Sequence, residues 1–258
     1  MNSSRREQIR ELLCNRPFIS FDELHEMFPG VSNMTLRRDI EYFEEQSEAI
    51  KVRGGARSMK FITTCMEGKF SLRMNENTSA KQKIASVALS LIETERSVFL
   101  DSGTTIFQLA ATMPDERLVV TTTGPNIALE LIKKKLPIVN LVGGMLNRDS
   151  ISVSGNNATK FLADINIDVA FIVPSGASAE TGFTCGNYAE CEFKRQVIEK
   201  ARRTIILADH SKFGRTLPYT FAEFGMVDTI ITDRAVSGDI ADAAKRAGTQ
   251  IIAADIGE

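Results

Sequence analysis

The fold of the N-terminal region is decided by the stretch Val31-Ser32-Asn33-Met34-Thr35-Leu36-Arg37-Arg38-Asp39-Ile40. It predicts a helix with Ser32 as its N-cap, because a serine hydroxyl can accept a hydrogen bond from an N–H group of the first turn. At helical spacing, Leu36 and Ile40 share an apolar face, whereas Arg38 points the opposite way. The stretch therefore predicts a helix with one buried side and one basic side.

The basic side of this helix indicates DNA recognition. A guanidinium group can contact phosphate oxygens, and it also matches the O6 and N7 acceptors of guanine in the major groove. In helix-turn-helix proteins the N-terminal end of the second helix approaches the base edges. The alternative interpretation is an ordinary charged helix face in solvent. The helix residues expected to contact DNA are Ser32, Asn33, Met34, Thr35, Arg37 and Arg38.

Two helices are predicted before this stretch. Residues 6–13 alternate apolar and charged side chains at helical spacing. The helix is expected to end before Pro17, because the residue before a proline avoids the helical region. Ser20 is expected to cap a second short helix, with Glu23 completing a capping box. The turn at Pro29-Gly30 then leads into the basic helix, so the arrangement is that of a helix-turn-helix.

A short basic hairpin is predicted after the third helix. Residues 50–56 read Ile-Lys-Val-Arg-Gly-Gly-Ala, an alternating strand that runs into a Gly-Gly turn. Residues 49–60 contain four cations and no acid, so this segment forms a local basic edge. We expect it to act as a wing, in which Lys51 and Arg53 contact the DNA backbone. The net charge of −2 argues against indiscriminate coating of nucleic acid.

Composition favours a cytoplasmic globular protein of two domains, one of them small. The chain has 258 residues, of which 43% are hydrophobic and 25% charged, and it contains no apolar run long enough to span a bilayer. Its four cysteines form no C-x-x-C pair, which argues against a zinc finger or a disulfide framework. His25 and His210 fall in different predicted domains. We therefore expect no metal site and no cofactor.

The C-terminal part has the pattern of an α/β domain. Residues 1–58 form the predicted winged helix-turn-helix domain, residues 59–78 are polar and irregular and form the predicted linker, and the second domain covers residues 79–258. Helices are expected at 79–93, 106–113, 126–135, 190–201 and 240–247. Strands are expected at 97–100, 118–121, 138–142, 169–173, 204–208, 229–231 and 250–253. Continuously apolar strands alternating with amphipathic helices predict a Rossmann-like, mostly parallel sheet with helices on both faces.

Two loops of the second domain carry residues suited to a phosphate. The first strand runs through Asp101-Ser102-Gly103-Thr104-Thr105 into a helix, whose first N–H groups and hydroxyls could bind an anion. An ordinary strand-to-helix turn is the alternative. A second apolar strand leads into residues 208–214, so Lys212 is expected on the same rim of the sheet, where its ammonium could supply a positive charge. Glu190 and Lys194 lie four residues apart, and a helix-surface ion pair is their simplest interpretation.

The sequence resembles the DeoR-type bacterial transcriptional regulators. The family signature V-S-x-x-T-I-R-R-D-L is matched at residues 31–40, and R-x-H-G-G-A is matched at residues 51–56. Ser47, Lys51 and Arg53 depart from the usual Gly, Arg and His. The sensor motifs D-x-G-T-T, G-G, E-x-x-x-K-R and A-D-x-S-K-F-G are matched at residues 101–105, 143–144, 190–195 and 208–214, whereas the usual T-N-S reads Thr-Thr-Gly at residues 122–124.

This resemblance implies a regulator of a carbohydrate operon, most often a repressor. The family's sensor domain is similar to ribose-5-phosphate isomerase in fold, and its members generally respond to phosphorylated sugars. Double-stranded operator DNA and a sugar phosphate are thus the expected partners, and a homodimer or higher oligomer is expected because such domains read paired half-sites. The residues expected at the effector site are Lys81, Asp101, Ser102, Gly103, Thr104, Thr105, Ser175, Glu190 and Lys212.

Two other classes of function compete with this interpretation. One is a sugar-phosphate isomerase fused to a DNA-binding domain, with Glu190 as the base that abstracts a carbon-bound proton. The isomerase segment D-G-A-D, however, resembles residues 175–178, where Ser175 and Ser178 replace both carboxylates. Such a site would bind a sugar phosphate without converting it. The other class, a helix-turn-helix protein that only scaffolds other proteins, is disfavoured by the ligand motifs.

Overall fold

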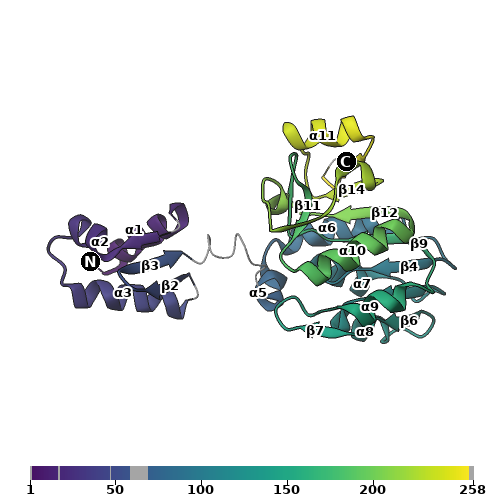
Figure 1. The fold of residues 1–258 in the computed structure, drawn as a ribbon, viewed down its shortest axis with the longest axis horizontal. Helices are drawn as coiled ribbons and strands as arrows, with labels where there is room; N and C mark the ends of the chain where they lie inside the picture. The colour runs from purple at the N-terminus through teal and green to yellow at the C-terminus, as the bar shows by residue number, and fades with distance from the viewer. Residues whose placement is uncertain (1, 17, 47, 59–68, 256–258) are drawn as a thin grey trace. The chain divides into compact units, whose positions relative to one another are not determined.

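The computed structural model describes residues 2–16, 18–46, 48–58 and 69–255 (Figure 1). Pro17, Ser47, Lys60 and Cys65 lie outside these ranges, and so does the expected beginning of the linker. The chain divides into two compact units, Met1–Met66 and Glu67–Glu258. Within the described ranges, no helix combines the length and apolar character needed to traverse a bilayer.

The first unit is a winged helix, as predicted. Its elements in chain order are α1 (Asn2–Asn15), β1 (Phe18–Ser20), α2 (Phe21–Met27), α3 (Asn33–Glu45), β2 (Ala49–Val52) and β3 (Gly55–Ser58). The three strands form an antiparallel sheet in the order β1-β3-β2. The hairpin of β2 and β3 is the predicted wing. Strand β1 was not predicted, since three residues show no recognisable alternation.

Both predicted N-caps are present in this unit. The Ser20 hydroxyl accepts a hydrogen bond from the Glu23 N–H at 3.1 Å, and the Glu23 carboxylate accepts one from the Ser20 N–H at 2.9 Å. The Ser32 hydroxyl accepts from the Thr35 N–H at 3.3 Å and so marks the start of α3. The core beneath the helices consists of fully buried apolar residues, among them Ile9, Ile19, Leu24, Leu36, Ile40 and Phe43.

The second unit is built on a seven-stranded parallel sheet, in agreement with the predicted class. Its strands are β4 (Ser97–Leu100), β5 (Val119–Thr122), β6 (Ile138–Leu141), β9 (Ile167–Ile172), β12 (Ala201–Leu207), β14 (Thr229–Thr232) and β15 (Gln250–Ala253). They lie in the order β15-β14-β12-β9-β4-β5-β6, with every neighbouring pair parallel. In chain order, the strands run from β4 in the middle of the sheet to β6 at one edge. Strand β9 then lies on the other side of β4, and the later strands run to the opposite edge at β15. The topological switch point therefore lies between β4 and β9.

The remaining elements of this unit are shorter or lie on the faces of the sheet. The helices are α5 (Phe70–Asn75), α6 (Thr78–Leu89), α7 (Thr104–Thr112), α8 (Pro125–Leu131), α9 (Asn156–Leu162), α10 (Tyr188–Lys200) and α11 (Asp239–Ala247), with 3-10 turns η1 (His210–Lys212) and η2 (Phe224–Met226). The strands β10 (Gly176–Ser178), β11 (Gly182–Cys185) and β13 (Tyr219–Ala222) form an antiparallel sheet, and β7 (Met145–Asn147) pairs with β8 (Ser152–Ser154).

Several of these short elements were not predicted from the sequence. Helix α5 lies in the stretch for which an irregular linker was expected. The Phe70 ring is buried and meets the Phe107 ring edge-on, with the ring centres 6.4 Å apart. This tertiary contact holds six residues in a helix that has no side-chain cap. The predicted helices at 79–93 and 126–135 also end early, at Leu89 and Leu131.

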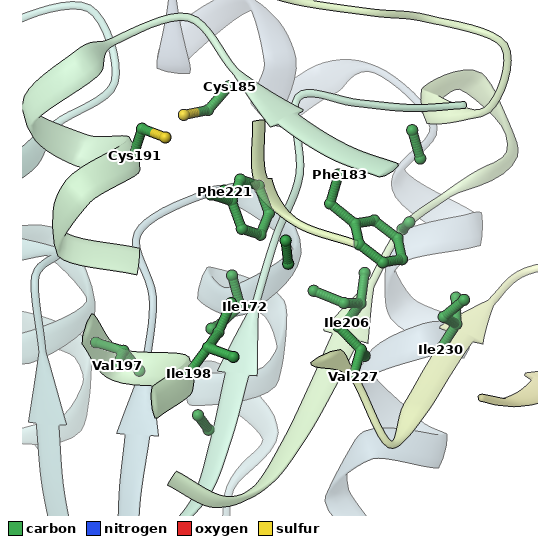
Figure 2. Packing of buried hydrophobic residues seen from close by; sticks show 14 of the residues in the cluster. Ile172, Phe183, Cys185, Cys191, Val197, Ile198, Ile206, Phe221, Val227 and Ile230 are labelled. Atoms are coloured by element: carbon green, nitrogen blue, oxygen red, sulfur yellow. The ribbon is translucent and has the colours of Figure 1, made fainter. Parts of the chain in front are cut away.

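Apolar residues cover both faces of the parallel sheet. Strand β4 sends Phe99 into one buried cluster and sends Val98 and Leu100 into the other. Figure 2 shows the first cluster, in which Phe183 and Phe221 of the antiparallel sheet lie near residues of the parallel strands such as Ile206. The second cluster packs the sheet against α6, α7 and α8. Burial on both faces explains why the parallel strands read as continuous apolar runs.

Candidate DNA-binding and effector sites

Helix α3 has the two-sided character that its sequence predicts. Ser32, Asn33, Arg37 and Arg38 are exposed, Met34 keeps 65% of its surface accessible, and Thr35 is partly buried. The opposite side, formed by Leu36, Asp39, Ile40 and Phe43, is buried. The Arg37 guanidinium lies 5.3 Å from the centre of the Phe21 ring in α2. The exposed face near the start of α3 thus carries every helix residue expected to contact DNA.

A buried ion pair that the sequence analysis missed joins α3 to α1. Asp39 is 2% exposed, and its two carboxylate oxygens lie 2.6 Å from Arg5 Nε and 2.8 Å from Arg6 Nε. The Arg6 guanidinium also lies 4.0 Å from the centre of the Tyr42 ring. An acid on the apolar side of a helix is the signal that could have revealed this pair. Because the contact couples two helices, it helps to set the orientation of α3 in the first unit.

The wing presents its two predicted cations differently. Lys51 Nζ lies 2.6 Å from Glu41 Oε1, and the Lys51 N–H donates to Glu44 at 2.9 Å, so α3 neutralises this charge. The hydrogen bond from Lys51 lowers the pKa of Glu41. Arg53 lies in the exposed turn between the strands. A Cβ atom at Gly55 would lie 2.1 Å from the Ile19 carbonyl oxygen, which explains the glycine there.

The predicted phosphate loop lies at the topological switch point of the second unit. Asp101 follows β4 and is 2% exposed. Its Oδ1 atom accepts a hydrogen bond from the Ser102 N–H at 2.8 Å, and its Oδ2 atom accepts one from the Val173 N–H, which follows β9, at 3.0 Å. Asp101 thus joins the two strands that flank the switch point, where open α/β sheets bind their ligands.

Lys194 completes a buried charged cluster that the sequence analysis did not foresee. Its ammonium lies 3.0 Å from Asp101 and 2.9 Å from Glu190, donates to the Val173 carbonyl at 2.7 Å, and is 1% exposed as a residue. The interpretation of Glu190 and Lys194 as a surface pair is therefore wrong. Helix α10 packs against the sheet with Glu190 and Lys194 on its buried side. Burial raises the pKa of Asp101, and the Lys194 ammonium opposes that rise.

The loop after Asp101 is shaped by Gly103. Its φ of +134° suits glycine, and an added Cβ atom would lie 2.8 Å from a Val173 methyl group. The Phe107 N–H donates to the Gly103 carbonyl at 2.9 Å and closes the first turn of α7. The three N–H groups before it have no acceptor within the helix. Ser102, Thr104 and Thr105 are each about 5% exposed, so this N-terminus lies in a nearly enclosed position.

Lys81 and Lys212 have different surroundings. Lys81 is 2% exposed, and its ammonium donates to the carbonyls of Arg73 and Glu76 at the end of α5. Lys81 thus stabilises the end of α5, and its expected contact with the effector stays a prediction. Burial lowers its pKa, while the Asp209 carboxylate opposes that effect and the Lys212 ammonium adds to it. Lys212 is partly buried in η1.

The remaining expected residues lie around the same loops. Ser175 follows β9, is 6% exposed, and donates its N–H to the Thr184 carbonyl at 2.9 Å. Glu190 lies in the first turn of α10, where the Asn187 side chain caps its N–H at 3.0 Å. Asp209 caps η1, because its side chain accepts a hydrogen bond from the Ser211 N–H at 3.0 Å. Among the described residues, no three His, Cys, Asp or Glu side chains are arranged to hold a metal ion.

Comparisons with known proteins agree with these features. The model for the DeoR-like helix-turn-helix domain matches residues 5–61, and the model for the DeoR C terminal sensor domain matches residues 76–234. The chain is 33% identical over 225 residues to the transcriptional repressor GlcR of Bacillus subtilis, covering 86% of this chain and 85% of that protein. It is 30% identical over 243 residues to the transcriptional regulator IolR of the same species, covering 93% and 94%.

A third relative is the glycerol-3-phosphate regulon repressor of Escherichia coli K12, which is 29% identical over 232 residues and covers 90% of both chains. A ribose 5-phosphate isomerase structure from Methanocaldococcus jannaschii aligns with a TM-score of 0.40 and 16% identity over 54% of this chain and 55% of that chain. The relatives over nearly the full length are regulators, which favours a regulator over an isomerase. The chain belongs to the DeoR family of DNA-binding transcriptional regulators.

Proposed function

We propose that this regulator represses a carbohydrate-utilisation operon in the cytoplasm and that a phosphorylated sugar, bound at the switch point of the second unit, controls its affinity for operator DNA. The single observation that carries the proposal is the juxtaposition of two features. The buried cluster of Asp101, Lys194 and Glu190 adjoins the nearly enclosed N-terminus of α7. One feature suits sugar hydroxyl groups, and the other suits a phosphate.

The phosphate is assigned to Ser102–Thr105 and Lys212. The first N–H groups of α7 and the adjoining hydroxyls supply donors, and the positive end of the helix dipole favours a dianion. Lys212 supplies a full charge from the loop after β12. Both loops follow parallel strands, so both lie on the carboxyl rim of the sheet. A sugar without phosphate would forgo most of these contacts.

The sugar hydroxyls are assigned to Asp101, Ser175 and Glu190. Carboxylates accept hydrogen bonds from hydroxyl groups, and the Lys194 ammonium, 3.0 Å from Asp101 and 2.9 Å from Glu190, holds both carboxyl groups in place. The serines at positions 175 and 178 cannot serve as carboxylate bases, and the Ser178 hydroxyl already lies 2.7 Å from that of Thr181. The site is therefore suited to binding a sugar phosphate rather than to isomerising it.

The exposed side of α3 is assigned to the major groove. Arg37 and Arg38 supply forked donors for base edges and phosphates, while Asn33 and Met34 lie on the accessible first turn. Arg53 in the wing turn is assigned to the DNA backbone. Lys51 contributes less than its sequence position suggests, because Glu41 already pairs with it.

The proposal is tested with the full chain and the DNA upstream of its own gene. Thermal unfolding is measured with a panel of hexose, pentose and triose phosphates and with the same compounds lacking the phosphate. We expect at least one phosphorylated compound, and none of the unphosphorylated ones, to raise the unfolding temperature and to change the affinity for DNA in a mobility-shift assay. A response to the unphosphorylated sugar of equal size would contradict the assignment of a phosphate site.

A further inference from the structure

The parallel sheet of the second unit ends at β6, whose outer side has no neighbouring strand among the described residues. The Ile138 N–H donates to the Leu118 carbonyl and the Val142 N–H donates to the Thr122 carbonyl, so every second residue of β6 faces β5. The N–H and C=O groups of the residues between them, Val139 and Leu141, therefore point away from β5. These groups form an exposed edge that can pair with another strand.

Large apolar side chains surround this edge, and we refer to them as the edge patch. Each has between 45% and 71% of its surface exposed, and they come from α8 and the segment after it, from β6, and from β7, which Figure 1 shows at the same side of the unit. Leu136 and Ile138 also line a hollow of about 480 Å³, together with Leu118, Val119 and the charged residues Glu95, Arg117 and Lys135. The edge patch consists of Leu129, Ile132, Leu136, Ile138, Leu141, Met145 and Leu146.

The opposite edge of the same sheet differs. In β15 the apolar residues Ile251 and Ile252 are partly buried and pack against the two core clusters. Proteins usually protect an exposed edge with charged residues, proline or a covering element. Strand β6 reads Ile-Val-Asn-Leu and contains none of these residues. Its combination of free edge and apolar surroundings is what a strand shows when its partner belongs to another chain.

We propose that β6 is a homodimer interface, in which the β6 strands of two copies of this chain pair antiparallel across a two-fold axis. A second copy is the occupant because a two-fold interface must be self-complementary, and an uncharged strand edge flanked by apolar residues meets that condition. The seven side chains each expose on the order of 100 Å². Together they approach the roughly 800 Å² per partner that a stable interface buries.

The hydrogen-bonding pattern defines one register. With the axis at Asn140, Val139 faces Leu141 of the partner subunit, and each such pair exchanges two hydrogen bonds. Moving the axis towards the start of the strand would place Pro137, which has no N–H, opposite Leu141. Moving it the other way would pair Val139 with Gly143, beyond the end of the strand. Asn140 therefore faces Asn140 of the partner subunit.

A cysteine at the axis tests this register. In an antiparallel pair of strands, opposed residues that exchange no hydrogen bonds have Cα atoms about 4.5 Å apart. This distance lies within the range that a disulfide spans. In the full chain under glutathione redox buffer, we expect Asn140→Cys to form a covalent dimer on a non-reducing gel, at least about tenfold more than the parent. Met226→Cys is the matched control, because Met226 is 45% exposed and lies outside the edge patch.

Sedimentation equilibrium tests the interface itself. We expect the parent to be a dimer or larger at micromolar concentration, and the double variant Ile138→Lys with Leu141→Lys to dissociate at concentrations at least about 100-fold higher. Met226→Lys should assemble like the parent. Circular dichroism should show the parent's folded spectrum for both the double variant and Met226→Lys. A monomeric parent, a double variant that assembles like the parent, or an Asn140→Cys chain that cross-links no more than the control would each overturn the proposal. These measurements involve neither DNA nor effector, so their outcome is separate from that of the proposed function.

Discussion

Replacing Lys194 with methionine is expected to destabilise the second unit by about 3–5 kcal/mol near neutral pH. Methionine keeps much of the length and apolar bulk of the side chain but removes the ammonium, which lies 3.0 Å from Asp101 and 2.9 Å from Glu190. These two carboxylates are 2% and 7% exposed, so water cannot replace the lost partner. The penalty is that of a buried charge left without its counter-charge.

This destabilisation should become smaller as the pH falls. Burial raises the pKa of Asp101, and the Lys194 ammonium opposes that rise, so the pKa is higher still in the variant. Unfolded, the same carboxyl has an ordinary pKa of about 3.9. Protonation of this buried carboxyl therefore stabilises the folded variant. The stabilisation is complete below the unfolded pKa and is lost as the pH rises through the higher folded pKa. The difference from the parent should therefore be larger at pH 7.5 than at pH 5.

The free energy of unfolding is measured by urea titration followed by tyrosine fluorescence. The chain has no tryptophan and three tyrosines, so in a Tyr42→Phe background the signal comes from Tyr188 and Tyr219 of the second unit. The control is Lys83→Met, at a half-exposed lysine that pairs with Asp255, and we expect it to cost at most about 0.5 kcal/mol. A loss below about 1 kcal/mol for the Lys194 variant, or an equal loss at pH 5 and pH 7.5, would refute this account of the cluster.

Three further predictions concern ligand and DNA. Lys212→Ala should weaken binding of the active sugar phosphate about tenfold or more by calorimetry, with the effector-free affinity for DNA unchanged; equal effector affinity would place the phosphate elsewhere. Gly103→Ala should destabilise the second unit by about 1–3 kcal/mol and weaken effector binding, because of its φ and its distance from Val173; parent-like unfolding and calorimetry would show the loop to be tolerant. Arg38→Ala should cost about 1–3 kcal/mol at one operator position, whereas Arg53→Ala should weaken all sequences alike and lower the salt slope by roughly 0.9; unchanged footprints and slopes would argue against this docking.

Much of the fold could be predicted from the sequence because the deciding interactions are local. A serine three residues before a free N–H group specifies a cap, as at Ser20 and Ser32, and both caps are present in the structure. Strands buried on both faces must be apolar throughout, and the edge strand β6 is apolar although it is exposed, so all seven strands of the parallel sheet were found within a few residues. The loop at Asp101–Thr105 was also recognisable, since small residues between a strand and a helix have a limited set of uses. The position of Lys212 just after an apolar strand was recognisable in the same way, and the binding of a phosphate by these residues stays a prediction.

Other features depend on contacts between residues far apart in the chain. Lys194 reads as half of a surface pair until the packing of α10 brings it to Asp101, 93 positions earlier, and to the Val173 carbonyl. Asp39 becomes a link between helices only because α1 places two arginines beside it. Helix α5 and the sheet of β10, β11 and β13 are too short to be recognised by periodicity, and they exist because Phe70, Phe183 and Phe221 are buried against other elements. Local chemistry determines where helices and strands begin, whereas the burial of charge and of short segments is determined by which surfaces meet when the chain folds.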